Sequence, residues 1–273
     1  MKINLNGLVA APHTPFHADG SLHLGIIEKQ VDTLRTNGVT AAFICGTTGE
    51  GMSMTLPERR QVAERWVEAS RGTGLKVIVN ASHLCLGDIQ ELGAHADSIG
   101  ADAFAIMAPS FFRPARLEEL VAFCAESAKA APGLPFYYYH MPGMTGVTFP
   151  MANFLPQAAE HIPNFGGIKF TSEDLMDYGR TLTAAGDSFE VLFGRDEILL
   201  SALALGAKGA IGSTYNFCAP LYHKVIAAYE AGDLPAAQLG QAKVMEMVAV
   251  LNRYGGLAAG KAMMALIGVD CGP

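Results

Sequence analysis

Short apolar runs alternate along the chain with longer segments in which apolar residues recur at helical spacing. Each run is apolar throughout, without the regular polar–apolar alternation of a half-exposed strand, which is typical of strands covered on both faces. Such strands are usually parallel and lie beneath helices. The runs predict eight strands within residues 7–15, 41–47, 76–82, 103–109, 135–142, 166–172, 189–196 and 209–216.

Each predicted strand is followed by a segment with the pattern of a helix. The second of these begins with the tetrapeptide TLPE, in which Thr55 and Glu58 predict a capping box and proline lies in the first turn. Several segments end at glycine, a common residue after a helix. The predicted helices are Leu24–Asn37, Leu56–Gly72, Ile89–Ser98, Leu117–Ala131, Ala152–His161, Asp174–Ala185, Ile198–Leu205 and Pro220–Ala231.

Eight strands that alternate strictly with eight helices in 273 residues favour a closed (β/α)8 barrel, the TIM barrel, over an open doubly wound sheet. We assign residues 1–233 to this barrel. Two more helices, Pro235–Tyr254 and Leu257–Ile267, are predicted within residues 234–273. Because no linker divides the chain, we expect this C-terminal helical appendage to belong to the same structural unit.

The composition supports one substantial core, since half of the residues are hydrophobic and 16% are charged. The formal net charge of −7, without a cluster of lysine and arginine, argues against a nucleic-acid partner. The longest uncharged run, residues 130–159, contains five prolines and therefore does not predict a membrane-spanning helix.

The five cysteines are odd in number and form no Cys-x-x-Cys pair. We therefore expect reduced, mostly buried thiols and a cytoplasmic protein, and the opening residues show no secretory or transit segment. Histidines near strand ends lack metal-ligand spacing, and no dinucleotide fingerprint occurs. Neither a metal nor another cofactor is expected.

Functional side chains of a TIM barrel come from the carboxyl ends of the strands and from the loops that follow them. Here these positions carry polar residues, among them one lysine, one well-placed tyrosine and two adjacent carboxylates. The set is Thr14, Thr47, Thr48, Glu50, Ser82, His83, Ser110, Tyr139, His140, Lys169, Thr171, Asp196, Glu197, Ser213, Thr214 and Asn216.

Lys169 gives the strongest single signal, because it lies inside the apolar strand FGGIKF. Among Phe165, Ile168 and Phe170 an ammonium group loses hydration, which lowers its pKa. A neutral buried amine is the nucleophile needed to form a Schiff base with a carbonyl substrate. A lysine that pairs with a carboxylate, or whose amine reaches the rim, explains the pattern equally well.

Tyr139 ends the preceding predicted strand, so its phenol is expected at the same mouth, where it could transfer protons. For Tyr137 and Tyr138 we prefer packing roles. The loop GTTGE, residues 46–50, combines two hydroxyls with several backbone N–H groups, which suits a carboxylate. Alone, such a turn is weak evidence for binding.

The segments GTTGEGMSMTLPERRQVAERW, PFYYYHMPGMTGV, GGIKFTS, FGRDE and GAIGSTYN, in this order, resemble the pyruvate-dependent class I aldolase superfamily. That superfamily includes dihydrodipicolinate synthases and N-acetylneuraminate lyases, and the chain is most similar to the lyase branch that carries FYYYH. The resemblance spans essentially the whole chain and implies a homotetramer that needs no cofactor. Relatives continue beyond the position of Cys271-Gly272-Pro273, a difference expected to affect oligomer contacts more than the catalytic set.

The resemblance implies a role for each matching residue. Lys169 would form the Schiff base, and Tyr139 would be the catalytic tyrosine. Thr47 and Thr48 would bind the carboxylate derived from pyruvate. The residues that would contact the sugar-derived part are Thr171, Gly194, Asp196, Glu197, Gly212 and Ser213.

Two departures argue against dihydrodipicolinate synthase activity. Enzymes with that activity carry an arginine after the tyrosine strand, which holds the second substrate's carboxylate, and here Met144 stands at that position. They also carry a tyrosine on the fourth strand that reaches a neighbouring subunit's site, and here Ser110 stands there. A buried substrate carboxylate needs a charge partner, whereas Asp196 and Glu197 suit a polyhydroxylated chain.

The expected activity is the reversible cleavage of N-acetylneuraminate to N-acetylmannosamine and pyruvate. One alternative is an aldolase of the same superfamily that acts on another 2-oxo acid, such as a 2-keto-3-deoxy sugar acid. Another is a non-catalytic protein that keeps the pocket as a sensor. Substrate profiling distinguishes the expected activity from that of an aldolase for another 2-oxo acid. Trapping of pyruvate on the protein distinguishes an enzyme from a non-catalytic sensor. Arg195 is interpreted as a residue of the rim.

Overall fold

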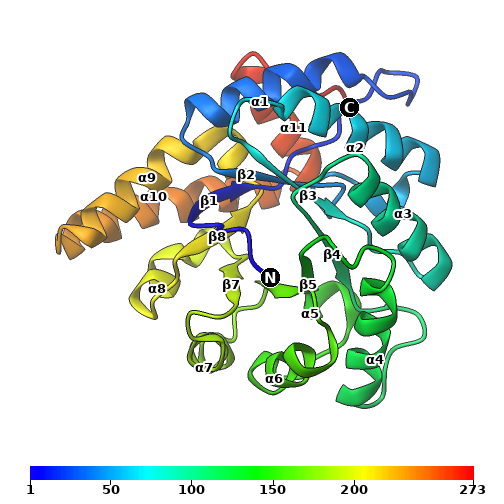
Figure 1. The fold of residues 1–273 in the computed structure, drawn as a ribbon. Helices are drawn as coiled ribbons and strands as arrows, with labels where there is room; N and C mark the ends of the chain where they lie inside the picture. The colour runs from blue at the N-terminus through cyan, green and yellow to red at the C-terminus, as the bar shows by residue number, and fades with distance from the viewer.

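A computed structural model describes all of residues 1–273. Its strands form one closed parallel barrel, in which each strand pairs with the next along the chain and the last pairs with the first. Figure 1 shows the strands as a central ring with helices outside it. The predicted TIM barrel is therefore confirmed. The strands are β1 (Gly7–Ala10), β2 (Ala41–Ile44), β3 (Lys76–Asn80), β4 (Ala103–Met107), β5 (Phe136–His140), β6 (Phe165–Phe170), β7 (Glu190–Phe193) and β8 (Gly209–Gly212).

Helices follow the strands in the predicted order and cover the outside of the ring. No helix combines the length and the apolar composition that a membrane crossing needs. Three 3-10 turns lie at Leu24–Ile26, Gly51–Ser53 and Asp196–Ile198. The α-helices are α1 (Ile27–Thr36), α2 (Leu56–Ser70), α3 (Leu86–Ser98), α4 (Leu117–Ala128), α5 (Pro142–Thr145), α6 (Met151–His161), α7 (Leu175–Ala185), α8 (Leu199–Ala204), α9 (Tyr215–Glu230), α10 (Leu234–Arg253) and α11 (Leu257–Leu266).

The ring of strands separates two apolar cores. Successive side chains of a strand point to opposite faces, so alternate residues enter the barrel and the others lie beneath the helices. The outer core is a cluster of 53 buried residues. The inner core is a cluster of 12 buried residues and includes Phe43, Tyr139 and Leu192. Any polar side chain on the inner face is therefore held among apolar neighbours.

The helix after β8 begins earlier than predicted. The strand prediction extended to residue 216, but β8 ends at Gly212 and α9 begins at Tyr215 rather than at Pro220. Pro220 lies inside the helix, although proline there removes one backbone bond and its ring crowds the carbonyl of residue 216. The first turn is held by Asn216, whose Nδ2 donates to Ala11 O and to Ser213 O, each at 2.7 Å.

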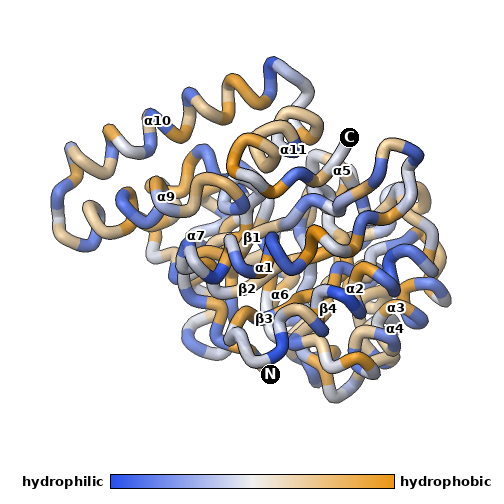
Figure 2. Tube along the Cα trace, turned by 90° about the horizontal axis from the view of Figure 1, so that it is seen from above, coloured by the Kyte–Doolittle hydropathy of each residue, from blue (hydrophilic) through white to orange (hydrophobic).

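The C-terminal helices pack against the barrel at the mouth formed by the carboxyl ends of the strands. α10 contacts α9 and the turn at Asp196–Ile198, and α11 contacts α9 and α10. Figure 2 shows α11 and α5 at one end of the molecule and the N-terminus at the opposite end. The appendage is thus in a position to contribute side chains to the mouth of the barrel.

The capping box of α2 gives a stability prediction. Thr55 Oγ1 accepts from Glu58 N, and Glu58 Oε2 accepts from Thr55 N at 2.8 Å, as the sequence predicted. Thr55→Ala removes the cap, so we expect a loss of about 1 kcal/mol. That corresponds to a fall in Tm of roughly 2–4 °C, measured by circular dichroism. Thr183→Ala, at an exposed position inside α7, is the control and should leave Tm nearly unchanged. Equal melting of both variants would contradict the assigned cap.

Candidate active site

A cavity of about 280 Å³ lies at the carboxyl ends of the strands. All ten residues to which the sequence assigned catalysis or substrate binding line it, together with eight others. A larger cavity of about 370 Å³ lies at the amino ends, where TIM barrels do not place their active sites. The ten residues are Thr47, Thr48, Tyr139, Lys169, Thr171, Gly194, Asp196, Glu197, Gly212 and Ser213.

Lys169 enters the barrel interior from β6. It lies opposite Tyr139 of β5 in the strand register, and its side chain is 4% exposed. Its Nζ lies 3.9 Å from the ring centroid of Tyr139 and 4.0 Å from that of Phe43. Desolvation was expected from Phe165, Ile168 and Phe170, but all three belong to the outer core. Ile168 and Phe170 point away because side chains alternate along a strand, and Phe165 lies before an irregularity in the pairing of β5 and β6.

The amine of Lys169 is held in a state that suits nucleophilic attack. Burial lowers its pKa to about 7, while the negative charge of Asp196 acts in the opposite direction. None of the ion pairs in the chain includes Lys169. The alternative of a lysine paired with a carboxylate is therefore wrong. Near neutral pH a large fraction of the side chain is the free amine.

Tyr139 brings a phenol to the same cavity. Its hydroxyl lies 3.3 Å from Thr47 Oγ1, with which it shares a hydrogen bond, and 3.0 Å from Met141 Sδ. Burial raises the pKa of Tyr139 to about 12, and the hydrogen bond with Thr47 acts against that rise. The phenol is therefore protonated at neutral pH. It can donate a proton, or pass one on as it accepts another.

The loop at residues 46–50 has an unusual and tightly packed backbone. Cys45 and Glu50 adopt left-handed conformations, with φ of 54° and 56°. A Cβ atom at Gly51 would lie 1.9 Å from Cys45 O, so only glycine fits there. The backbone N–H groups of Thr47 and Thr48 donate to no acceptor in the protein. With two hydroxyls beside them, these N–H groups can bind an anionic oxygen.

Asp196 is a buried carboxylate with fixed partners. Its Oδ2 accepts from Thr214 N at 2.9 Å and from Thr214 Oγ1 at 2.7 Å. Thr214 Oγ1 also lies 2.5 Å from the hydroxyl of Tyr222. Burial raises the pKa of Asp196 to about 6, although the bonds from Thr214 lower it. A Cβ atom at residue 212 would lie 1.8 Å from Asp196 Oδ1, so Gly212 makes room for this carboxylate.

Gly194 and Arg195, which follow β7, form another part of the cavity wall. A Cβ atom at Gly194 would lie 2.0 Å from Thr171 Oγ1, so glycine here leaves space for that hydroxyl. Arg195 lines the cavity and forms ion pairs with Glu173 and, at 2.9 Å, with Glu197. Its interpretation as a residue of the rim was incomplete, because its side chain bridges two acidic residues beside the cavity.

Helix α10 contributes to the cavity wall, which was not predicted from the sequence. Val248, Leu251 and Asn252 of this helix line the cavity beside the strand ends. The appendage was predicted as two helices without a part in the site, and no local pattern distinguishes these residues from an ordinary amphipathic helix. Met141, which accepts from Tyr139, was also missed. Its position directly after β5 was the one available signal.

Several polar residues at strand ends support the backbone and do not line the cavity. Thr14 Oγ1 donates to Gly49 O at 2.6 Å, and Ser82 Oγ donates to Asn80 Oδ1 at 2.7 Å. His140 is buried against Phe170 on the outer face. Ser110 and Met144, which occupy the two diagnostic positions, are also absent from the cavity wall. No group of three or more His, Cys, Asp or Glu side chains is placed to hold a metal ion.

Comparison with known proteins places the chain among enzymes. The N-acetylneuraminate lyase of Xenopus tropicalis is 43% identical over 272 residues, which cover 98% of this chain and 89% of the relative. The mouse (Mus musculus) N-acetylneuraminate lyase is 42% identical over 276 residues, which cover 100% of this chain and 86% of the relative.

Solved structures give the same grouping. The N-acetylneuraminate lyase of Proteus mirabilis matches with a TM-score of 0.95 at 43% identity, covering 98% of this chain and 90% of that chain. The N-acetylneuraminate lyase (sialic acid aldolase) of Aliivibrio salmonicida matches with a TM-score of 0.95 at 44% identity. The match covers 98% of this chain and 89% of that chain. The family described as dihydrodipicolinate synthetase matches residues 4–273. With its barrel, its buried lysine and these relatives, the chain belongs to the dihydrodipicolinate synthetase family.

Proposed function

We propose that this protein is a Schiff-base aldolase that reversibly cleaves N-acetylneuraminate to N-acetylmannosamine and pyruvate. The observation that carries the proposal is the amine of Lys169, buried without an ion pair between two aromatic rings and facing a phenol. Curated relatives named N-acetylneuraminate lyase, identical at 42–43% over nearly the full chain, support the choice of substrate.

The reaction begins with the neutral amine of Lys169. Its nitrogen attacks the C2 keto carbon of the open-chain sugar acid, and loss of water leaves an iminium ion. The iminium ion accepts the electron pair of the C3–C4 bond when that bond breaks, which releases N-acetylmannosamine. The resulting enamine is protonated at C3, and water then hydrolyses the iminium ion to pyruvate and the free amine. Atoms and charge balance without a cofactor.

Bond cleavage requires removal of the proton from the C4 hydroxyl. Tyr139 is protonated at neutral pH, so we assign it the role of a relay rather than of a free base. Its phenol accepts the C4 proton as it passes its own to the substrate carboxylate, and Thr47, which shares a hydrogen bond with the phenol, orients it. Positioned proton transfer of this kind contributes roughly 10²–10⁴-fold in rate.

The remaining cavity residues orient the substrate. The hydroxyls and free N–H groups of Thr47 and Thr48 bind the carboxylate, which brings the keto carbon beside Lys169. On the other side, Asp196 and Glu197 offer acceptors for sugar hydroxyls. Thr171, Gly194, Gly212 and Ser213 complete this wall.

Two accompanying expectations stay predictions. A homotetramer is implied by the resemblance to relatives. A cytoplasmic location is supported by five cysteines that are all free.

The direct test is pyruvate release from N-acetylneuraminate, followed as NADH loss with lactate dehydrogenase as the coupling enzyme. A 2-keto-3-deoxy sugar acid is assayed in parallel. Turnover of N-acetylneuraminate alone supports the proposal. Turnover of the other acid alone would withdraw the sialic-acid assignment and keep the aldolase.

Lys169→Ala should abolish turnover, because no other amine reaches the keto carbon. Borohydride reduction in the presence of pyruvate should add mass to the wild-type protein and none to the variant. Lys208→Ala, which removes an exposed lysine that pairs with Asp187, is the matched control and should keep full activity. Activity in a folded Lys169→Ala protein would refute the Schiff base.

Tyr139→Phe should lower kcat by roughly 10²–10⁴-fold, since it removes the proton relay. Imine formation with pyruvate should remain detectable, because Lys169 is untouched. Tyr138→Phe is the matched control, since the hydroxyl of Tyr138 is buried on the outer face without a partner. A normal kcat for Tyr139→Phe would remove the relay assignment.

The pH profile follows from the pKa of Lys169. Below about pH 7 the amine becomes protonated and cannot attack, so kcat/KM should fall about tenfold per pH unit. Asp196→Asn should move this acid limb to lower pH, because the carboxylate raises the pKa of Lys169. Stopped assays at constant ionic strength measure both. An acid limb near pH 10 would show that the amine is not desolvated.

A further inference from the structure

Lys261 of α11 is a buried cation far from the reacting amine. Its side chain is 4% exposed, and its Nζ lies 2.8 Å from Glu50 Oε1. The same Nζ donates to Pro273 O at 2.6 Å and lies 4.8 Å from the ring centroid of Phe16. Because the geometry at Glu50 Oε1 is that of an ion pair and not of an aligned hydrogen bond, the contact is mainly electrostatic. A buried charge of this kind is stable only when it is paired.

The partner of Lys261 belongs to the loop that carries the carboxylate-binding residues. Glu50 closes the GTTGE loop and holds a left-handed backbone at φ 56°. Its N–H donates to Thr47 O at 3.1 Å, so the conformation of Glu50 is tied directly to Thr47. A non-glycine residue in this region costs on the order of 1–3 kcal/mol and persists only when its surroundings determine it. The ion pair with Lys261 is one such determinant.

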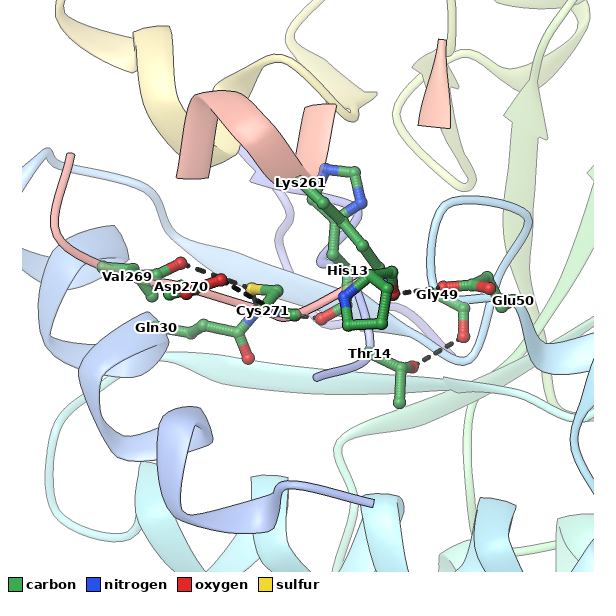
Figure 3. A network of polar contacts seen from close by, with 11 residues as sticks. His13, Thr14, Gln30, Gly49, Glu50, Lys261, Val269, Asp270 and Cys271 are labelled. Atoms are coloured by element: carbon green, nitrogen blue, oxygen red, sulfur yellow. Dashed lines mark hydrogen bonds and ion pairs between the residues drawn. The ribbon is translucent and has the colours of Figure 1, made fainter. Parts of the chain in front are cut away.

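A second set of contacts holds the same loop from the side of residues 13–16 (Figure 3). Thr14 Oγ1 donates to Gly49 O at 2.6 Å. α11 packs closely here, because a Cβ atom at Gly260 would lie 2.7 Å from His13 Cε1. The segment after α11 adds a backbone bond from Phe16 N to Cys271 O at 3.0 Å. α11 and the residues after it therefore stabilise the loop in two ways, directly through Lys261 and Glu50 and indirectly through residues 13–16.

His13 does not compete with Lys261 for Glu50. Burial and the neighbouring charge of Lys261 lower the pKa of His13 to about 4, so its ring is neutral at physiological pH. No other side-chain carboxylate pairs with Lys261, whose remaining hydrogen bond goes to Pro273 O. Within the loop, Glu50 is therefore the side chain that this cation contacts.

We infer that Lys261 is a positioning residue of the active site, which acts through its ion pair with Glu50 to hold Thr47 and Thr48 in the geometry that binds the substrate carboxylate. The inference rests on the role proposed above for these two threonines. Lys261 touches no reacting atom, so its loss should weaken binding of every 2-oxo acid and leave the chemistry at Lys169 intact.

The experiment measures the affinity for pyruvate alone. Wild type, Lys261→Met, Glu50→Gln and the double variant are titrated with pyruvate, reduced with borohydride and analysed by mass spectrometry. Each single variant should bind pyruvate about tenfold more weakly, equivalent to 1.4 kcal/mol. The double variant should be no worse than either single variant, because both changes remove the same interaction.

Two further readouts separate positioning from general destabilisation. The acid limb of the pH profile should stay where it is in wild type, since the surroundings of Lys169 are unchanged. Lys129→Met, which breaks an exposed ion pair with Glu126, is the matched control and should keep wild-type affinity. If Lys261→Met does not fold, Glu50→Gln carries the test, because Glu50 is partly exposed and the change preserves its shape.

Unchanged pyruvate affinity in folded Lys261→Met or Glu50→Gln would overturn the inference, as would fully additive losses in the double variant. Failure of wild type itself to trap pyruvate would overturn the proposed function together with this inference. Normal trapping in wild type with equal affinity in the variants would overturn the positioning role alone.

Discussion

The removal of Lys169 from water is the constraint on which the rest of this active site depends. The faces of the Phe43 and Tyr139 rings attract a cation, but Lys169 has no carboxylate in an ion pair, and the cost of removing its charge from water favours the neutral amine. A carboxylate in contact with Nζ would restore the charge and abolish nucleophilicity. The structure avoids this because the nearest acidic side chain, that of Asp196, is turned to the N–H and hydroxyl of Thr214. Exclusion of water from the barrel interior therefore sets the protonation state of Lys169.

Around that amine, the wall is shaped by close packing as much as by polar groups. Glycine at positions 194 and 212 lets the Thr171 hydroxyl and the Asp196 carboxylate lie where a methyl group would stand. Arg195 neutralises part of the charge of Glu173 and Glu197, so the acidic side of the cavity is less negative than its sequence suggests. The cavity is therefore asymmetric, with backbone N–H groups that have no acceptor in the protein on one side and carboxylate and hydroxyl acceptors on the other.

The barrel, Lys169 and Tyr139 could be predicted because each leaves a local signal, either a strand pattern or a polar residue at a strand end. The side chains that surround Lys169 were not predicted correctly, since those of Ile168 and Phe170 point to the outer face of the barrel and not toward the amine. Contacts between distant parts of the chain left no signal at all. The wall supplied by α10 and the ion pair between Glu50 and Lys261 depend on how the appendage packs, which is a tertiary property. The start of α9 was missed for a different reason, because proline is common in the first turn of a helix and here lies inside it, after a first turn held by side-chain bonds from Asn216.

The first and last parts of the chain meet in the folded protein, because β1 pairs with β8 and Phe16 N donates to Cys271 O. The barrel can therefore close only after nearly the whole chain has been synthesised. The ribosome releases Lys169 well before β8, α10 and α11 have emerged. Until β8 closes the ring, the inner face of β6 is open to water, and a hydrated lysine has a pKa of about 10.4 and is protonated at neutral pH. A reactive amine at Lys169 therefore requires the closed ring, and we expect partly synthesised chains to keep this side chain in its charged form.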